Sequence, residues 1–174
     1  FPTRRSSDLE YLNRFVENWH YTREGFSAVE YFAYASICFS TVLPAVLSTR
    51  TLLASIPRLD RAFRSFHRLR VPHPKLVAGL LLAVTAAGLA CVGLAPDLLF
   101  PLLWLGPLVL VVSLQVVLGR PHIFTRLRNG DWRLVVTSAA AALVCGFFWE
   151  LWNYWSLARW TSTVPFVHAV PLFV

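Results

Sequence analysis

The chain has 174 residues, of which 56% are hydrophobic and 14% are charged, and its formal net charge is +7. Soluble domains carry roughly 25% charged residues, so this composition excludes an ordinary water-soluble domain and favours a lipid bilayer as solvent. The cations gather in two linkers rather than along one face, which argues against nucleic acid as a partner. The five histidines and three cysteines show no metal-ligand spacing, so we expect no metal site and no cofactor.

The ends of the chain suggest a fragment. Residues 1–9, FPTRRSSDL, resemble the translation of a sequencing adapter. The chain contains no methionine and ends within an apolar stretch. We therefore expect residues 1–9 to be an artefact and residues 10–174 to be a truncated transmembrane bundle.

Four segments satisfy the requirement of a membrane helix for about 20 mainly apolar residues. They cover about 26–47, 76–95, 98–118 and 134–155. Their apolar runs are continuous, unlike the alternating strands of a membrane barrel. We predict an all-α, polytopic transmembrane helix bundle with these four spans and the end of an earlier one. Pro96 and Asp97 are expected to form a tight hairpin between the second and third spans.

The linkers predict the orientation of the bundle. Residues 48–75 contain seven Lys and Arg side chains, and residues 119–133 contain four. Because positively charged loops remain in the cytoplasm, both linkers are predicted to be cytoplasmic. The 19–25 segment, the hairpin and the residues beyond Trp155 then face the other side.

The first linker carries an apolar stripe at steps of four and three residues. Its members are Leu52, Ile56, Leu59, Phe63 and Phe66. With arginines largely opposite, the stripe predicts a basic amphipathic helix over about 52–70, with Pro57 in a first turn and Asp60 complementing the helix dipole. Such a helix would lie on an anionic leaflet, or dock a protein partner. Residues 71–74 are expected to be an extended connector.

A motif of Glu, Asn and Trp occurs twice. Its copies are Glu10, Asn13 and Trp19, and Glu150, Asn153 and Trp160. If Glu10 ends an earlier span, that span precedes the fourth by four helices and runs in the same direction. We therefore interpret the motif as a parallel internal repeat.

Glu150 is the leading candidate for a functional group. Ser138, Ala142 and Gly146 follow one another at four-residue intervals, a pattern that lets membrane helices approach closely, and one further step reaches Glu150. The carboxyl is thus expected on the packing face, with Asn153 one turn away as its partner. The alternative is a carboxyl near the interface that snorkels or is protonated. The second span carries a similar stripe of small residues: Gly79, Ala83, Ala87 and Cys91.

Other residues are expected to join this site on the outer side. Glu10 would pair with Asn13, and Glu30 lies one turn into the first span. Burial and mutual repulsion would raise the pKa of such carboxyls, so Glu150 and Glu10 are hypothetical acid/base groups. The candidate ligand-binding residues are Asn153, Asn13, Glu30, Trp149, Trp160, Trp19 and His20. The tryptophans are explained equally by an interfacial aromatic belt.

The segment CGFFWELWNYW at 145–155, with Trp160 and VPF at 164–166, resembles a family of uncharacterised bacterial multi-pass membrane proteins. NWHY at 18–21 and TVLPA at 41–45 resemble the same family, which brings no established activity. A fainter resemblance links Trp160 to Pro165 with the lycopene-cyclase domain, and it implies protonation and ring closure of a polyene. The paired acidic motif of those cyclases is missing from this sequence.

Three classes of function follow from these patterns. The first is a protein that binds a lipid or isoprenoid at outer-leaflet depth, with or without catalysis. The second is a proton- or cation-coupled transporter, and the third is a structural or assembly protein of the membrane. The sequence leaves open the ligand, the oligomeric state and whether the chain is an enzyme.

Overall fold

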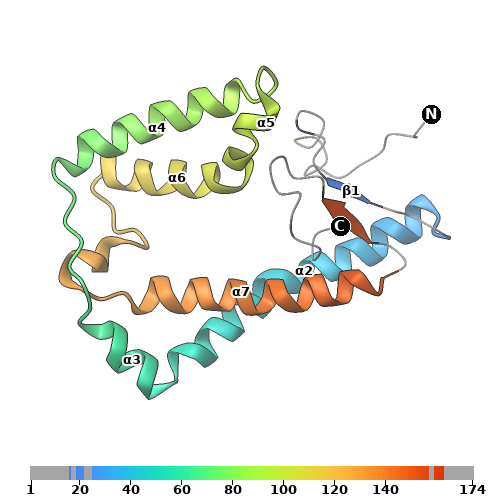
Figure 1. The fold of residues 1–174 in the computed structure, drawn as a ribbon, viewed down its shortest axis with the longest axis horizontal. Coiled ribbons are helices and arrows are strands. Elements are labelled where there is room, and N and C mark those ends of the chain that lie inside the picture. The colour runs from blue at the N-terminus through green and yellow to red at the C-terminus, as the bar shows by residue number, and fades with distance from the viewer. Residues whose placement is uncertain (1–15, 17–18, 22–24, 157–158, 163–174) are drawn as a thin grey trace. The chain divides into compact units, whose positions relative to one another are not determined.

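The computed structural model describes residues 16, 19–21, 25–156 and 159–162 (Figure 1). These residues are mostly helical, which confirms the predicted all-α class. The chain divides into two compact units. The α2–α7 unit contains residues 21–70 and 123–159, and the α4–α6 unit contains residues 1–20, 71–122 and 160–174.

The α2–α7 unit is built on two long helices, α2 (Ala28–Ala54) and α7 (Arg133–Tyr154). They lie side by side and run in opposite directions (Figure 1). A capping box starts α2: the Ser27 backbone N–H donates to Glu30 Oε2 at 3.0 Å, and the Glu30 N–H donates to Ser27 Oγ at 3.3 Å. The unit also holds the short helix α3 (Pro57–Arg64) and the 3-10 helix η1 (Thr125–Asn129).

The contact between α2 and α7 uses small side chains on α7. Thr137, Ala141 and Cys145 are the buried residues of this helix, and Cys145 Sγ lies 3.5 Å from Thr49 Oγ1 of α2. The predicted stripe of Ser138, Ala142 and Gly146 is therefore wrong by one residue. A Cβ atom added to Gly146 would meet nothing within 4 Å, so this glycine does not mediate a close approach among the described residues.

The amphipathic helix predicted over 52–70 is also wrong in its extent. Because no glycine or proline interrupts the sequence after Leu47, α2 continues to Ala54. The chain then breaks at Ser55 and Ile56, since a proline at 57 disfavours helical backbone at the preceding residue, and Ile56 is extended with ψ 113°. Only the eight residues of α3 form the basic helix, which begins at Pro57 as expected.

The α4–α6 unit is a helical hairpin of α4 (Pro74–Ala90) and α6 (Pro101–Val117), joined through the four-residue helix α5 (Pro96–Leu99). Each helix begins at a proline, whose missing N–H costs nothing in a first turn. The connection is longer than the predicted two-residue turn because α4 ends at Ala90 and Pro101 starts a new helix. A Cβ on Gly106 would lie 3.0 Å from Leu89 Cδ1, so this glycine lets α6 approach α4.

The stripe predicted in the second span is not the contact face of α4. The buried residues of α4 are Ala78 and Thr85, whereas Ala83 and Ala87 are exposed. The connector before α4 also departs from the extended form that was expected. His73 has φ +45° and ψ 57°, which is left-handed backbone, directly before Pro74.

Two helices among the described residues are long and apolar enough to cross a membrane, Val29–Ala54 and Arg133–Tyr154. The helices α4 and α6 have 17 residues each. Seventeen residues rise about 26 Å, less than the roughly 30 Å of a hydrocarbon core. The structure therefore supports two of the four predicted spans by length and composition.

Two short strands were not anticipated from the sequence. They are β1 (Trp19–Tyr21) and β2 (Trp160–Ser162), and they pair in a two-stranded sheet. The pairing brings together the backbone of the two segments that begin with the tryptophans of the repeated motif.

The contact face of α7 generates a direct prediction. Ala141 is 0% exposed, so Ala141→Leu should force α2 and α7 apart at a cost of about 1–3 kcal/mol. Ala142→Leu is the matched control, because Ala142 is exposed one position along the same helix. Thermal unfolding of both variants in detergent should show a lower Tm for Ala141→Leu alone. Equal Tm values would contradict this assignment of the contact face.

Candidate functional site

The end of α7 holds the carboxyl–amide pair that the sequence singles out. Glu150 is exposed, whereas Asn153 and Trp149 are half-buried. On a helix with 100° per residue, Glu150 shares a face with Leu143, Phe147 and Tyr154. This face lies opposite the side of α7 that contacts α2, so the expected burial of Glu150 against a neighbouring helix is wrong within this unit.

Large aromatic side chains at the end of α7 are exposed. Phe147 and Tyr154 are 66% and 67% exposed, and Trp155 is 79% exposed. The rings of Tyr154 and Trp155 meet edge to face with centroids 5.1 Å apart, and Phe148 pairs with Trp152 at 6.0 Å. Tyr and Trp combine an apolar body with a polar tip, which suits them to a membrane interface.

Glu30 lies toward the same end of the antiparallel helix pair as Glu150, because α2 begins where α7 ends (Figure 1). Its carboxylate has a structural task there. Glu30 Oε2 accepts hydrogen bonds from the backbone N–H and the hydroxyl of Ser27, at 3.0 and 2.7 Å. This capping role explains the presence of Glu30 in the first turn without a ligand.

The remaining candidate residues belong to the first copy of the motif and to the two strands. Glu10 and Asn13 lie outside the described residues. His20 in β1 is exposed and Trp160 in β2 is half-buried, while for Trp19 the structure describes only the backbone in β1. The convergence of the two Glu–Asn pairs and the parallel repeat stay predictions.

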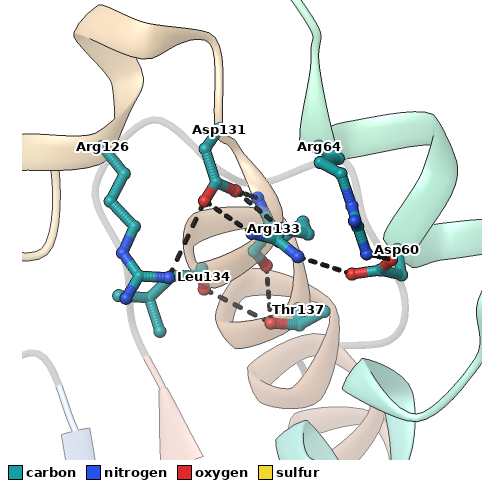
Figure 2. Close-up of polar contacts among 7 residues, drawn as sticks. All are labelled: Asp60, Arg64, Arg126, Asp131, Arg133, Leu134 and Thr137. Carbon is teal, nitrogen blue, oxygen red and sulfur yellow. Dashed lines mark hydrogen bonds and ion pairs between the residues drawn. The ribbon is translucent and has the colours of Figure 1, made fainter.

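A cluster of arginines and aspartates, which sequence reasoning did not find, lies at the opposite end of α7 (Figure 2). Arg133 occupies its centre. Its guanidinium donates to Asp60 Oδ1 at 2.7 Å and to the two carboxylate oxygens of Asp131 at 2.9 Å each. Arg64 forms an ion pair with Asp60, and Arg126 Nη1 lies 3.7 Å from Asp131 Oδ2. We call these five residues the Arg133 cluster.

Backbone contacts hold the two linkers around the Arg133 cluster. The Phe66 N–H donates to the Gly130 carbonyl at 2.8 Å, and the Trp132 N–H donates to the Phe63 carbonyl at 2.9 Å. The Trp132 indole N–H donates to the His67 carbonyl at 2.6 Å. Gly130 has φ +84°, and a Cβ there would lie 2.8 Å from the Phe66 carbonyl oxygen, so only glycine fits this approach.

The cluster changes the acidity of both carboxyls. Hydrogen bonding from Arg133, and then from Arg64, holds the pKa of Asp60 below its ordinary value of 3.8. Hydrogen bonding from Arg133 likewise lowers the pKa of Asp131, with a smaller opposing effect of burial. Both aspartates are therefore ionised at neutral pH, and their ion pairs with Arg133 hold the two linkers together.

A signal for this cluster was present in the sequence. Asp60 is the only acidic residue in the linker 48–75, and Asp131 is the only one in 119–133. A single carboxylate in each arginine-rich linker indicates that the carboxylate forms an ion pair with an arginine. Local periodicity does not reveal which arginine pairs with Asp60, since Asp60 and Arg133 are 73 residues apart.

No protein-family model, curated protein or solved structure matches the chain.

The lowered pKa values predict how stability depends on pH. A carboxyl with a depressed pKa in the folded state stabilises the fold above its unfolded value and loses that contribution as the pH falls through the folded pKa. We expect a constant Tm near neutrality and a decline below about pH 4. Arg133→Gln should lower the Tm at pH 7 by several degrees and reduce this acid-dependent decline.

Arg58→Gln is the matched control for this experiment. It removes the same charge from an exposed arginine of α3 that has no carboxylate partner among the described residues. The Tm of both variants is measured by thermal unfolding across the acidic pH range. The same dependence of Tm on pH in Arg133→Gln and Arg58→Gln would contradict the proposed role of the cluster.

Proposed function

We propose that this chain is an integral protein of the bacterial cytoplasmic membrane that binds a lipid or isoprenoid at the outer end of α7. In this proposal α2 and α7 cross the bilayer, and α4 and α6 complete a multi-pass bundle with 17 residues each, the lower limit for a span. The two arginine-rich linkers lie in the cytoplasm.

The asymmetry of α7 supports this orientation. Its first residue is Arg133, within a cluster of arginines, and its last turns carry Trp149, Trp152 and Tyr154. Cationic residues favour the cytoplasmic end of a span, and aromatic residues favour the interfaces. The wide exposed apolar face of α7, including Leu143 at 75%, agrees with contact to acyl chains.

The exposed position of Glu150 among aromatic rings is the observation that carries the ligand proposal. A carboxylate on a spanning helix costs about 2.5–3.5 kcal/mol on insertion scales at the bilayer centre, so the position of Glu150 in the last turns of α7 places the carboxyl where that cost is lower. Phe147 and Tyr154 on the same face provide apolar area for a prenyl or acyl chain, and the carboxyl provides an acceptor for an amine or hydroxyl. The ligand would thus lie along the surface of α7 rather than in a pocket between α2 and α7.

The same geometry gives less support to a transporter. Transporters place their sites at discontinuous spans, whereas α2 continues as one helix through Pro44 and α7 contains no proline. Lipid recognition therefore remains the function we propose.

The orientation can be tested by labelling. In a variant without the native Cys38, Cys91 and Cys145, single cysteines at Arg58 and Thr161 should react with a membrane-impermeant maleimide from opposite sides. Intact inverted vesicles should label the Arg58→Cys variant, and spheroplasts should label the Thr161→Cys variant. Labelling of both from one side would contradict the proposed topology.

The ligand proposal predicts a loss of binding in Glu150→Gln. A hydrogen bond to a charged group contributes about 1.5–3 kcal/mol, so the affinity for a hydroxyl- or amine-bearing ligand should fall roughly 10- to 100-fold. Suitable probes are geranylgeraniol and phosphatidylethanolamine, each titrated against the full chain in neutral nanodiscs with tryptophan fluorescence as the readout. Asp97→Asn is the control, since Asp97 precedes α6 in the other unit. Unchanged affinity for both probes in Glu150→Gln would refute the site.

A further inference from the structure

The two arginine-rich linkers form a single surface in the α2–α7 unit. The Leu69 N–H donates to the Leu127 carbonyl at 3.0 Å, three residues along from the bond between Phe66 and Gly130. The two bonds run in an antiparallel register, which brings Arg68 and Arg70 beside η1. A Cβ on Gly130 would lie 3.5 Å from Arg68 Cγ, so the side chain of Arg68 lies against the Gly130 turn.

The charges on this surface are far from balanced. Residues 48–70 and 123–133 contain nine arginines and two carboxylates, an excess of seven positive charges (9 − 2). Both carboxylates are bonded to Arg133 within the cluster. Five exposed arginines consequently have no carboxylate partner among the described residues: Arg58, Arg61, Arg68, Arg70 and Arg128.

Exposed apolar side chains alternate with these arginines. Phe66 is 57% exposed, Leu69 is 45% exposed, and Ile56 is 37% exposed. Segments that lie at a membrane interface combine apolar residues with Lys and Arg in this way. The surface also lies at the end of both helices that are able to cross a membrane, because α2 ends at Ala54 and α7 starts at Arg133.

We infer that this surface, formed by both linkers around the Arg133 cluster, binds the phosphate headgroups of anionic phospholipids in the leaflet where α2 ends and α7 begins. The planar guanidinium of arginine matches the oxygens of a phosphate group. Asp60 and Asp131 have a positioning role: they occupy Arg133 and hold the linkers together, and the five arginines that have no carboxylate partner among the described residues are left for lipid. This inference rests on the membrane location proposed above but is independent of the site at Glu150.

The surface differs from an amphipathic helix lying alone on the leaflet. Arg128 comes from the second linker and Arg68 from the first, so the headgroup site requires the tertiary contact at Gly130. A linear peptide of residues 52–70 would lack that contact, so the headgroup site is expected only in the full chain.

The test measures lipid selectivity of the full chain in vesicles of phosphatidylcholine. Spin-labelled phosphatidylglycerol and spin-labelled phosphatidylcholine report the relative association of each lipid with the protein. We expect a preference for phosphatidylglycerol that weakens as salt screens the charges. Because each arginine near an anionic surface contributes roughly a fivefold gain, Arg68→Gln/Arg128→Gln should reduce the preference by more than tenfold or abolish it.

Two control variants separate lipid recognition from general charge and from folding. Arg68→Lys/Arg128→Lys keeps the charge and should retain most of the preference. Arg159→Gln removes a cation beyond the other end of α7 and should leave the preference unchanged. Helical circular dichroism and Tm of all variants should match the unchanged chain, since Arg68 and Arg128 are exposed.

The outcomes distinguish this inference from the proposed function. If the chain resists extraction by alkaline carbonate but shows equal association with both lipids, or keeps its preference in Arg68→Gln/Arg128→Gln, the headgroup site is wrong and the membrane location stands. If the chain binds a polyglutamate peptide but shows no preference for phosphatidylglycerol, the headgroup site is also wrong, and an acidic protein partner is favoured instead. If the chain is extracted by carbonate, both the location and the headgroup site fail.

Discussion

The guanidinium of Arg133 is the constraint on which the α2–α7 unit depends. It joins Asp60 of α3 to Asp131 in the loop before α7, so one side chain connects two linkers that are far apart in sequence. The nine arginines of residues 48–70 and 123–133 repel one another, and two carboxylates offset only part of that repulsion. Both carboxylates pair with the same guanidinium, so the repulsion between the arginines is reduced most where the linkers meet. The backbone hydrogen bonds at Gly130 and Trp132 form at this place.

The arrangement of α2 and α7 explains why one face of α7 is left uncovered. The contact with α2 uses Thr137, Ala141 and Cys145, three small residues that allow two helices to approach closely. The large side chains Leu143 and Phe147 lie on the opposite side of α7 and are exposed. In water such a face would drive aggregation, whereas in a bilayer it is the ordinary boundary with lipid. Packing and composition thus favour the same environment for this helix pair.

The sequence predicted the helices better than their contacts. Pro57 was expected in a first turn and does start α3, and the long apolar runs predicted α2 and α7 with modest errors at the ends. In both α4 and α7, however, the stripe of small residues that spacing suggested misses the buried residues, by one position in α7 and by one or two positions in α4. Adjacent stripes on a helix rich in Ala, Gly, Ser and Thr satisfy the same spacing rule, and the partner helix decides between them. The Arg133 cluster escaped prediction because its ion pair links distant segments, and the expected Glu10 site falls outside the described residues.

The error in the contact face of α7 changes the kind of site that Glu150 can form. On the α2 side, the carboxyl would have been enclosed by protein, and acid/base chemistry in a buried pocket would have followed. On the opposite side, it lies on the face of α7 that is turned away from α2. In the two proposals made here, the Arg133 end of α7 binds anionic groups through charge, and the Glu150 end presents a hydrogen-bond acceptor near aromatic rings. In the proposed orientation the arginine-rich end of α7 lies at the anionic cytoplasmic leaflet, and Glu150 would then lie at the outer interface.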